Sequence, residues 1–219
     1  MTTVYFATNR RPNDSDEPTY FGKDFSSQGL SDLRFGYAEV EENFCPGAKL
    51  MVEPEQPGAG GIVPPSSRAF EHLRKKMKKQ RRPTLVYIHG YNTTFTESLL
   101  EAAVLKQVVG GVNVVVFAWP SDGSKTPWLA YKSDRQDARA SGPAIARGFM
   151  KLRDYLHALR EENHCRQPLH LVCHSMGTYV LRHAVQELMD EFWITPPKVF
   201  QQVVLAAPDE DSDALNDPT

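Results

Sequence analysis

The chain has 219 residues, of which 41% are hydrophobic and 24% charged, and its formal net charge at neutral pH is −2. These values are typical of one globular domain with a buried core, and the small net charge gives no reason to expect a nucleic-acid partner. The N-terminus lacks a long apolar run with a cleavage site, and no apolar stretch approaches the roughly 20 residues that cross a bilayer. Three cysteines without a CxxC pair predict neither a disulfide framework nor a zinc site. We therefore expect a cytoplasmic protein with no membrane partner.

The N-terminal part of the chain predicts two strands that pair antiparallel. The strands are expected at residues 4–8 and 34–40, and the polar segment between them, residues 11–33, reads as a long loop. Residues 54–65 read as a second connection rich in glycine and proline, before a helix over residues 66–80.

Apolar strands then alternate with helical patterns. The strands are expected at residues 84–89, 112–119, 169–172 and 199–206, and the helices at residues 95–109, 132–160 and 178–185. The pair Gly142-Pro143 should kink or break the second of these helices. This alternation predicts an α/β fold, a mainly parallel sheet flanked by helices, in a single domain over residues 1–219.

The pentapeptide Cys173-His174-Ser175-Met176-Gly177 stands between an expected strand and an expected helix. A strand, a sharp turn with serine at its apex and then a helix form the context of a nucleophilic serine. Small residues are needed two positions before and after the serine; Gly177 meets this demand, while Cys173 stands where glycine is usual. We interpret Ser175 as a nucleophile and the Met176 N–H as an oxyanion donor, with a plain turn serine as the alternative.

Four motifs follow one another along the chain. They are His89-Gly90-Tyr91-Asn92, Phe117-Ala118-Trp119-Pro120-Ser121, the serine turn, and Leu205-Ala206-Ala207-Pro208-Asp209. Together with residues 7–10 and 131–138, they resemble a bacterial α/β-hydrolase family catalogued mainly as a domain of unknown function, whose members look like serine esterases. The resemblance spans nearly the whole chain and implies the α/β-hydrolase fold.

Two further site residues are expected at the ends of strands that neighbour the serine. The backbone N–H of Tyr91 is the candidate second oxyanion donor, and His89 is expected to brace the same loop by hydrogen bonding. Asp209 lies just past the strand that follows the serine turn, at the edge where α/β sheets gather their active sites. It is our candidate for the acid of a catalytic triad; the alternative is a loop cap, with the acid beyond residue 219.

The histidine base is harder to place, because no histidine follows His183. In α/β-hydrolases the triad runs in the order serine, acid, histidine. His174 adjoins the nucleophile, but adjacent residues in a tight turn point in different directions. We therefore expect a C-terminally truncated chain that lacks the last strands and leaves the strand at residues 199–206 as an exposed apolar edge. A C-terminal fragment or a second chain would then complete the fold as a partner.

These features predict a serine hydrolase that cleaves a small-molecule carboxylic ester through an acyl-enzyme on Ser175, without a cofactor. A non-catalytic scaffold acting as a binding module, or a lipase or thioesterase, are the alternatives. No metal site is expected: Asp209, Asp211 and Asp213 alternate as in calcium loops, but alanine replaces the glycine that such a loop needs. Aromatic residues near the loop at 121–127 could line an acyl pocket or simply pack; these are Trp119, Trp128 and Tyr131.

Overall fold

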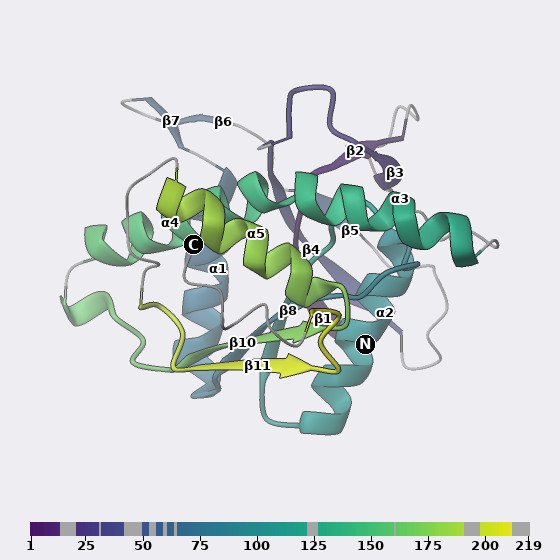
Figure 1. Ribbon diagram of the computed structural model, residues 1–219. Helices are drawn as coiled ribbons and strands as arrows, with labels where there is room; N and C mark the ends of the chain where they lie inside the picture. Colours follow the sequence, from purple (N-terminus) through teal and green to yellow (C-terminus); the bar gives the residue numbers. More distant parts are fainter. Residues whose placement is uncertain are drawn as a thin grey trace.

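A seven-stranded, mostly parallel sheet forms the centre of the part of the chain that the structure describes (Figure 1). The computed structural model describes residues 1–13, 21–30, 32–41, 50–52, 56–58, 61–63, 65–121, 127–159, 161–190 and 198–211. The strands are β1 (Thr2–Thr8), β4 (Arg34–Val40), β5 (Leu50–Val52), β8 (Thr84–Ile88), β9 (Asn113–Phe117), β10 (Leu169–His174) and β11 (Gln202–Ala206). They lie in the order β11-β10-β8-β9-β1-β4-β5, with β4 antiparallel to both of its neighbours and the other pairs parallel. The predicted fold class is therefore confirmed.

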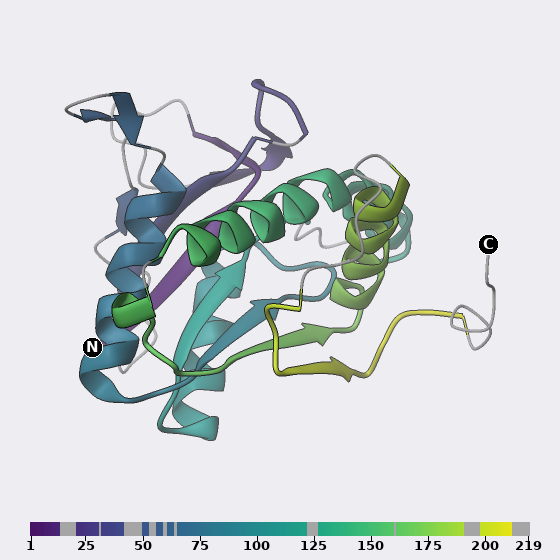
Figure 2. The same ribbon diagram turned by 90° about the vertical axis from the view of Figure 1, so that its left-hand side faces the viewer.

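Helices cover the sheet on two faces, with α2 on one face and α1, α4 and α5 on the other (Figure 2). Their bounds are α1 (Pro65–Gln80), α2 (Phe95–Val109), α3 (Pro127–Ala140), α4 (Gly142–Ala158) and α5 (Gly177–Asp190), with a 3₁₀ turn η1 (Glu161–Asn163). The side-chain period of two in a strand explains the two cores. In β8, Leu85 and Tyr87 pack with the residues of α2, whereas Val86 and Ile88 face the opposite layer. None of the helices described here is long and apolar enough to cross a bilayer.

The long helical pattern at residues 132–160 is divided, as Gly142-Pro143 predicts, into α3 and α4. Ser141 is the break, and Pro143 stands in the first turn of α4, where a missing N–H is tolerated. Gly142 also lets α4 approach α5, because a Cβ atom there would lie 2.9 Å from the Cβ of His183.

Two segments predicted as loops contain short antiparallel strands, and those predictions were wrong in part. Within the predicted loop at 11–33, β2 (Arg10–Pro12) pairs with β3 (Phe21–Phe25), and β6 (Gln56–Gly58) pairs with β7 (Gly61–Val63) in the second connection. Strands β2, β6 and β7 have three residues each, too few to show a side-chain period. The anchor of β3 is a tertiary contact, since the ring of Phe21 packs between Phe6 and Phe95 at 5.9 and 4.9 Å.

Strand β11, at one edge of the described sheet, is exposed as the sequence predicted. Val203, Val204 and Leu205 are 53%, 47% and 39% exposed. Consecutive strand residues point to opposite faces. Exposure of all three therefore means that neither face of β11 is covered by the described helices.

Candidate active site

Ser175 occupies the turn between β10 and α5 in a strained backbone conformation. Its φ is +52°, in the left-handed region that costs most residues about 1–2 kcal/mol. The Ser175 N–H donates to the carbonyl of Ala206 at 2.9 Å, and its carbonyl accepts from the N–H of Thr178 at 3.0 Å. These bonds hold the turn between β11 and the first residues of α5, with Ser175 partly exposed.

The residues two positions before and two positions after the serine, Cys173 and Gly177, are small for different physical reasons. A Cβ atom at Gly177 would overlap the carbonyl of Ile88 and lie 2.7 Å from the carbonyl oxygen of His89, so only glycine lets α5 start this close to β8. Cys173 is fully buried, with its side chain in the core under α5. Burial raises the pKa of the Cys173 thiol to about 12, so it stays protonated and is no rival nucleophile.

The loop after β8 lies against the serine turn. A Cβ atom at Gly90 would stand 3.2 Å from both the Cβ of Ser175 and the Nδ1 of His174. Within the described residues, neither the Tyr91 N–H nor the Met176 N–H donates a hydrogen bond. The two predicted oxyanion donors thus come from neighbouring strand ends, and both have a free N–H there.

His89 braces this loop, as the sequence predicted. Its ring is fully buried, and Nδ1 lies 2.7 Å from the carbonyl oxygen of Gly90, so Nδ1 is the nitrogen that carries the proton. Burial, with the charge of Arg10 adding to it, lowers the pKa of His89 to about 3. Trp119 stacks on the His89 ring at 5.1 Å and donates its Nε1–H to the His89 carbonyl at 2.9 Å. Trp119 is therefore a core residue rather than a pocket wall, and the Trp128 side chain lies outside the described residues.

A network of buried polar side chains holds the same loop, and sequence reasoning did not assign its members a role. Asp134, fully buried on α3, accepts from the N–H of Asn92 at 2.7 Å and from the hydroxyl of Ser121. The Ser121 Oγ accepts from the N–H of Thr93 at 3.1 Å, and Arg10 donates to the Thr93 carbonyl at 2.8 Å. The available signal was a charged residue in each of the two further segments that resemble the family, residues 7–10 and 131–138, because a buried charge requires several partners.

A backbone hydrogen bond of Asp209 holds this residue beside Ser175. Its N–H donates to the Ser175 carbonyl at 3.2 Å. Its carboxylate accepts from the Tyr131 hydroxyl at 2.9 and 3.0 Å and lies 3.8 Å from the Arg135 guanidinium, which stacks over the Tyr179 ring. Burial, then the bond to Asp209, raises the pKa of Tyr131, so its hydroxyl remains a donor. Among the described residues no histidine ring contacts this carboxylate.

The histidines nearest the serine point elsewhere. His174 is exposed and lines a groove on the α2 side of the sheet, with Glu97 and Glu101. His183 is packed edge-on against Tyr179 at 4.5 Å, and burial lowers its pKa to about 4. Across the described residues, no hydrogen bond joins a histidine ring to the Ser175 hydroxyl.

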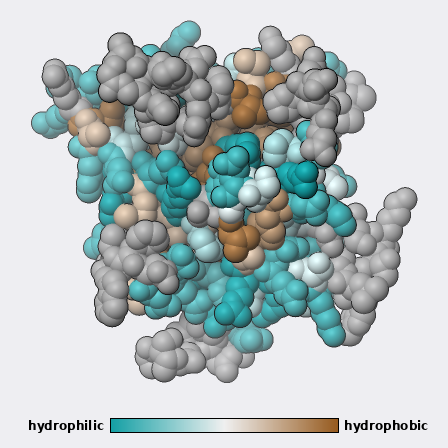
Figure 3. Space-filling view, turned by 90° about the horizontal axis from the view of Figure 1, so that it is seen from above, coloured by the Kyte–Doolittle hydropathy of each residue, from teal (hydrophilic) through white to brown (hydrophobic). Residues whose placement is uncertain are grey.

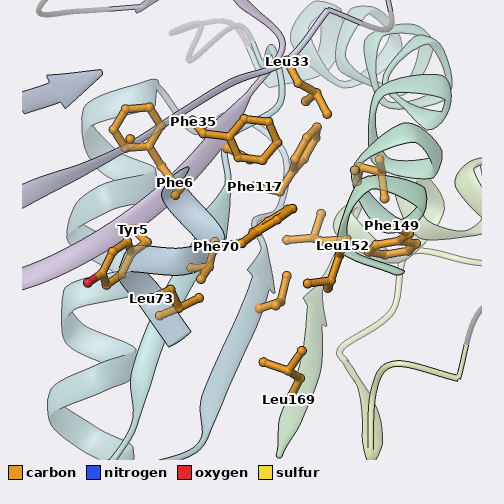
Figure 4. Close-up of a pocket in the computed structure, with 18 of the residues that line it drawn as sticks. Tyr5, Phe6, Leu33, Phe35, Phe70, Leu73, Phe117, Phe149, Leu152 and Leu169 are labelled. Atoms are coloured by element: carbon orange, nitrogen blue, oxygen red, sulfur yellow. The ribbon is translucent and has the colours of Figure 1, made fainter. Parts of the chain in front are cut away.

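A separate apolar cavity of about 90 Å³ lies between the sheet, α1 and α4. Figure 4 shows its walls, with Phe70 of α1 on the left, Phe149 of α4 on the right, and Phe35 and Phe117 of the sheet above them. Viewed from above, apolar atoms are visible in the middle of an otherwise mostly polar surface (Figure 3). Neither Ser175 nor Asp209 lines this cavity, so it is not part of the candidate active site.

The fold agrees with a comparison against known protein families. No curated protein matches the chain. A family model described as an alpha/beta hydrolase of unknown function (DUF900) matches residues 66–218, which include α1, the serine turn and Asp209. The chain belongs to this alpha/beta hydrolase family.

Proposed function

We propose that the protein is a serine hydrolase that cleaves carboxylic esters through an acyl-enzyme on Ser175. The observation that carries the proposal is the geometry of the turn: a serine at φ +52° between a parallel strand and a helix, with Gly90 packed against it. Such strain persists only where the surrounding structure imposes it, and it is concentrated at functional sites.

The proposed reaction has two halves. The Ser175 Oγ attacks the ester carbonyl carbon while a histidine base takes the hydroxyl proton, and the N–H groups of Tyr91 and Met176 bind the resulting oxyanion. Collapse of the tetrahedral intermediate expels the alcohol, which receives the proton from the histidine. Water then attacks the acyl-enzyme by the same route and restores Ser175; no cofactor is required.

Asp209 is the proposed acid that orients the base. A carboxylate has about four lone-pair positions, so the two contacts with Tyr131 leave room for an imidazole N–H. The bond from the Asp209 N–H to Ser175 supports this role, because it keeps the carboxylate beside the nucleophile.

We further propose that the base is carried by a polypeptide segment, in cis or in trans, that pairs with β11. The exposed residues Val203, Val204 and Leu205 support this, since an uncovered apolar edge strand is a ready site for a further strand. A strand that pairs parallel to β11 would end near Asp209, where the base is needed.

The second candidate is a non-catalytic scaffold that binds its ligand at the same turn. It is favoured by one observation: within the described residues, the Ser175 hydroxyl has no histidine partner.

Labelling with a fluorophosphonate probe separates the two candidates. The protein should be purified from its native host with any partner retained, and the labelled peptide identified by mass spectrometry. We expect one adduct on Ser175 that is absent from Ser175→Ala. No adduct on the wild type would favour the scaffold, and equal labelling of the variant would exclude Ser175 as the nucleophile. Hydrolysis of a short-chain p-nitrophenyl ester by the isolated 219-residue chain above about 1 s⁻¹ would contradict a base supplied by an added segment.

A further inference from the structure

We propose that Asp134 is a positioning residue for the oxyanion hole, which from α3 fixes the loop after β8 so that the Tyr91 N–H is held beside Ser175. The inference rests on the proposed function and adds to it a residue that never touches the substrate.

The contacts of Asp134 reach two consecutive backbone amides. Its Oδ2 accepts directly from the N–H of Asn92 at 2.7 Å and from the Ser121 hydroxyl at 2.5 Å. The same Ser121 Oγ accepts from the N–H of Thr93 at 3.1 Å. Asp134 and Ser121 have no measurable exposure, so these charge-assisted bonds lie out of water, where they are strong.

Hydrogen bonds constrain the peptide planes on both sides of Tyr91, the plane after it through Asp134 and the plane before it through His89. In the plane after it, the Asn92 N–H binds Asp134 and the Tyr91 carbonyl accepts from the Thr93 hydroxyl at 3.1 Å. In the plane before it, the Gly90 carbonyl is bound by His89 at 2.7 Å. A trans peptide points its N–H opposite to its C=O, so fixing the Gly90 carbonyl also fixes the direction of the Tyr91 N–H.

The loop also needs an anchor because its backbone is strained. Asn92 has φ +57°, which an asparagine adopts more readily than most residues but still at a cost. Without the carboxylate of Asp134, the Asn92 N–H would lose its partner, and the loop would relax away from this conformation.

Arg10 binds the same region through backbone carbonyl groups. Its guanidinium donates to the carbonyl of Thr93 at 2.8 Å and to that of Ser121 at 3.4 Å. Asp134 thus binds two amide groups of this loop, one directly and one through Ser121, and Arg10 binds the carbonyl group of Thr93 in it. In the described part of the chain, the Tyr91 N–H stays free for a substrate oxyanion, while these bonds hold the rest of the loop before any substrate arrives, which is what an oxyanion hole requires.

The test compares Asp134→Ala with Asp134→Asn in the protein with any partner retained. Loss of one oxyanion donor reduces kcat about 10²–10³-fold, and a misplaced donor should cost part of that. We expect Asp134→Ala to be labelled by the fluorophosphonate about 10–100-fold more slowly, with a matching fall in kcat and a small change in KM. Asp134→Asn keeps an acceptor oxygen for the Asn92 N–H and should recover most of the rate. Lys132→Ala, an exposed position on the same helix, is the control.

Hydrogen exchange at the Asn92 and Thr93 amides supplies a readout that does not depend on the reaction at Ser175. Both amides should lose protection in Asp134→Ala while the core strands keep theirs. Labelling of Asp134→Ala within twofold of the wild type would overturn the inference, as would loss of protection across the whole fold with no recovery in Asp134→Asn. If the wild-type protein is not labelled at Ser175, the proposed function fails and this inference fails with it. The wild-type reaction alone therefore tells failure of the proposed function from failure of the inference.

Discussion

Gly90 lies directly against Ser175: a Cβ atom at Gly90 would stand 3.2 Å from the Cβ of the serine. The two residues are far apart in the sequence, yet β8 and β10, which precede them, are hydrogen-bonded neighbours in the sheet. Parallel neighbours end at the same edge, so their following loops meet there. This contact brings the candidate nucleophile and the Tyr91 N–H into one site.

Substitution of Gly90 by alanine should damage the site more than the fold. The new methyl group would meet Ser175 and the His174 ring at 3.2 Å, so the loop must shift by a few tenths of an ångström. Because small misplacements at reacting groups are costly, we expect fluorophosphonate labelling of Ser175 to slow at least about tenfold. The free energy of unfolding, measured in urea, should fall by only about 1 kcal/mol. An unchanged labelling rate would show that the loop does not contribute to the reaction.

Asp209→Asn tests the proposed acid. If Asp209 orients the histidine, neutralising it should lower kcat by roughly 10⁴-fold, because the amide holds the imidazole in the wrong tautomer. Tyr131→Phe is the matched control, since it removes the hydroxyl that binds Asp209 and leaves the carboxylate in place. We expect a much smaller loss in that variant. A loss of less than about tenfold in Asp209→Asn would assign the acid to another residue.

Gly177→Ala should destabilise the fold severely. The added Cβ would overlap the Ile88 carbonyl and approach the His89 carbonyl to 2.7 Å, and both are backbone groups at the end of the central strand β8 that cannot rotate away. We expect a loss of about 3 kcal/mol in the free energy of unfolding, at the upper end for an overpacked core. Urea unfolding followed by circular dichroism measures it; a loss below about 1 kcal/mol would mean that α5 can move away from the sheet at little cost.

Gly148→Ala should have the opposite effect. Gly148 lies inside α4 and lines the apolar cavity, and a Cβ atom there would meet only Leu33 Cδ1, at an ordinary 3.6 Å. Alanine restricts the unfolded chain and favours the helix, so stability should rise by about 0.5–1 kcal/mol. The same urea measurement checks it, and a destabilised variant would show that the cavity wall is more closely packed than these distances indicate.

The buried His89 predicts a pH dependence of stability. Its pKa is lowered from 6.5 to about 3 by burial and by Arg10, so the unfolded chain binds a proton that the folded chain excludes. The contribution of the neutral His89 to the free energy of unfolding is fully present above pH 6.5. It is lost as the pH falls toward 3, by up to about 1.4 kcal/mol per pH unit. His89→Asn, which keeps a donor for the Gly90 carbonyl, should flatten the unfolding free energy between pH 6 and 4. The exposed His164, changed to asparagine, is the control, and an equal slope in wild type and His89→Asn would contradict the prediction.

Local patterns were enough to predict the main elements of the sheet and its helices. The helix at residues 95–109 agrees with α2 at both ends, because a Thr94–Glu97 capping box and the glycine at 110 mark its limits. The break before Pro143 was equally local. The β2–β3 hairpin was missed because its strands are held by the packing of Phe21, which no nearby residue reveals.

The sequence by itself determined that a strand, a serine turn and a helix follow one another between residues 169 and 185, since the apolar runs and the small residue at 177 demand it. It also determined the family, because the motifs are contiguous stretches of chain. Only the tertiary structure decided which loops meet Ser175, where Asp209 directs its carboxylate, and that Arg10 and Asp134 are buried in one network. These are contacts between residues far apart in the chain, and they depend on the order and direction of strands in the sheet. Each charged side chain could equally have been solvated, and only its burial shows that it stabilises the loop.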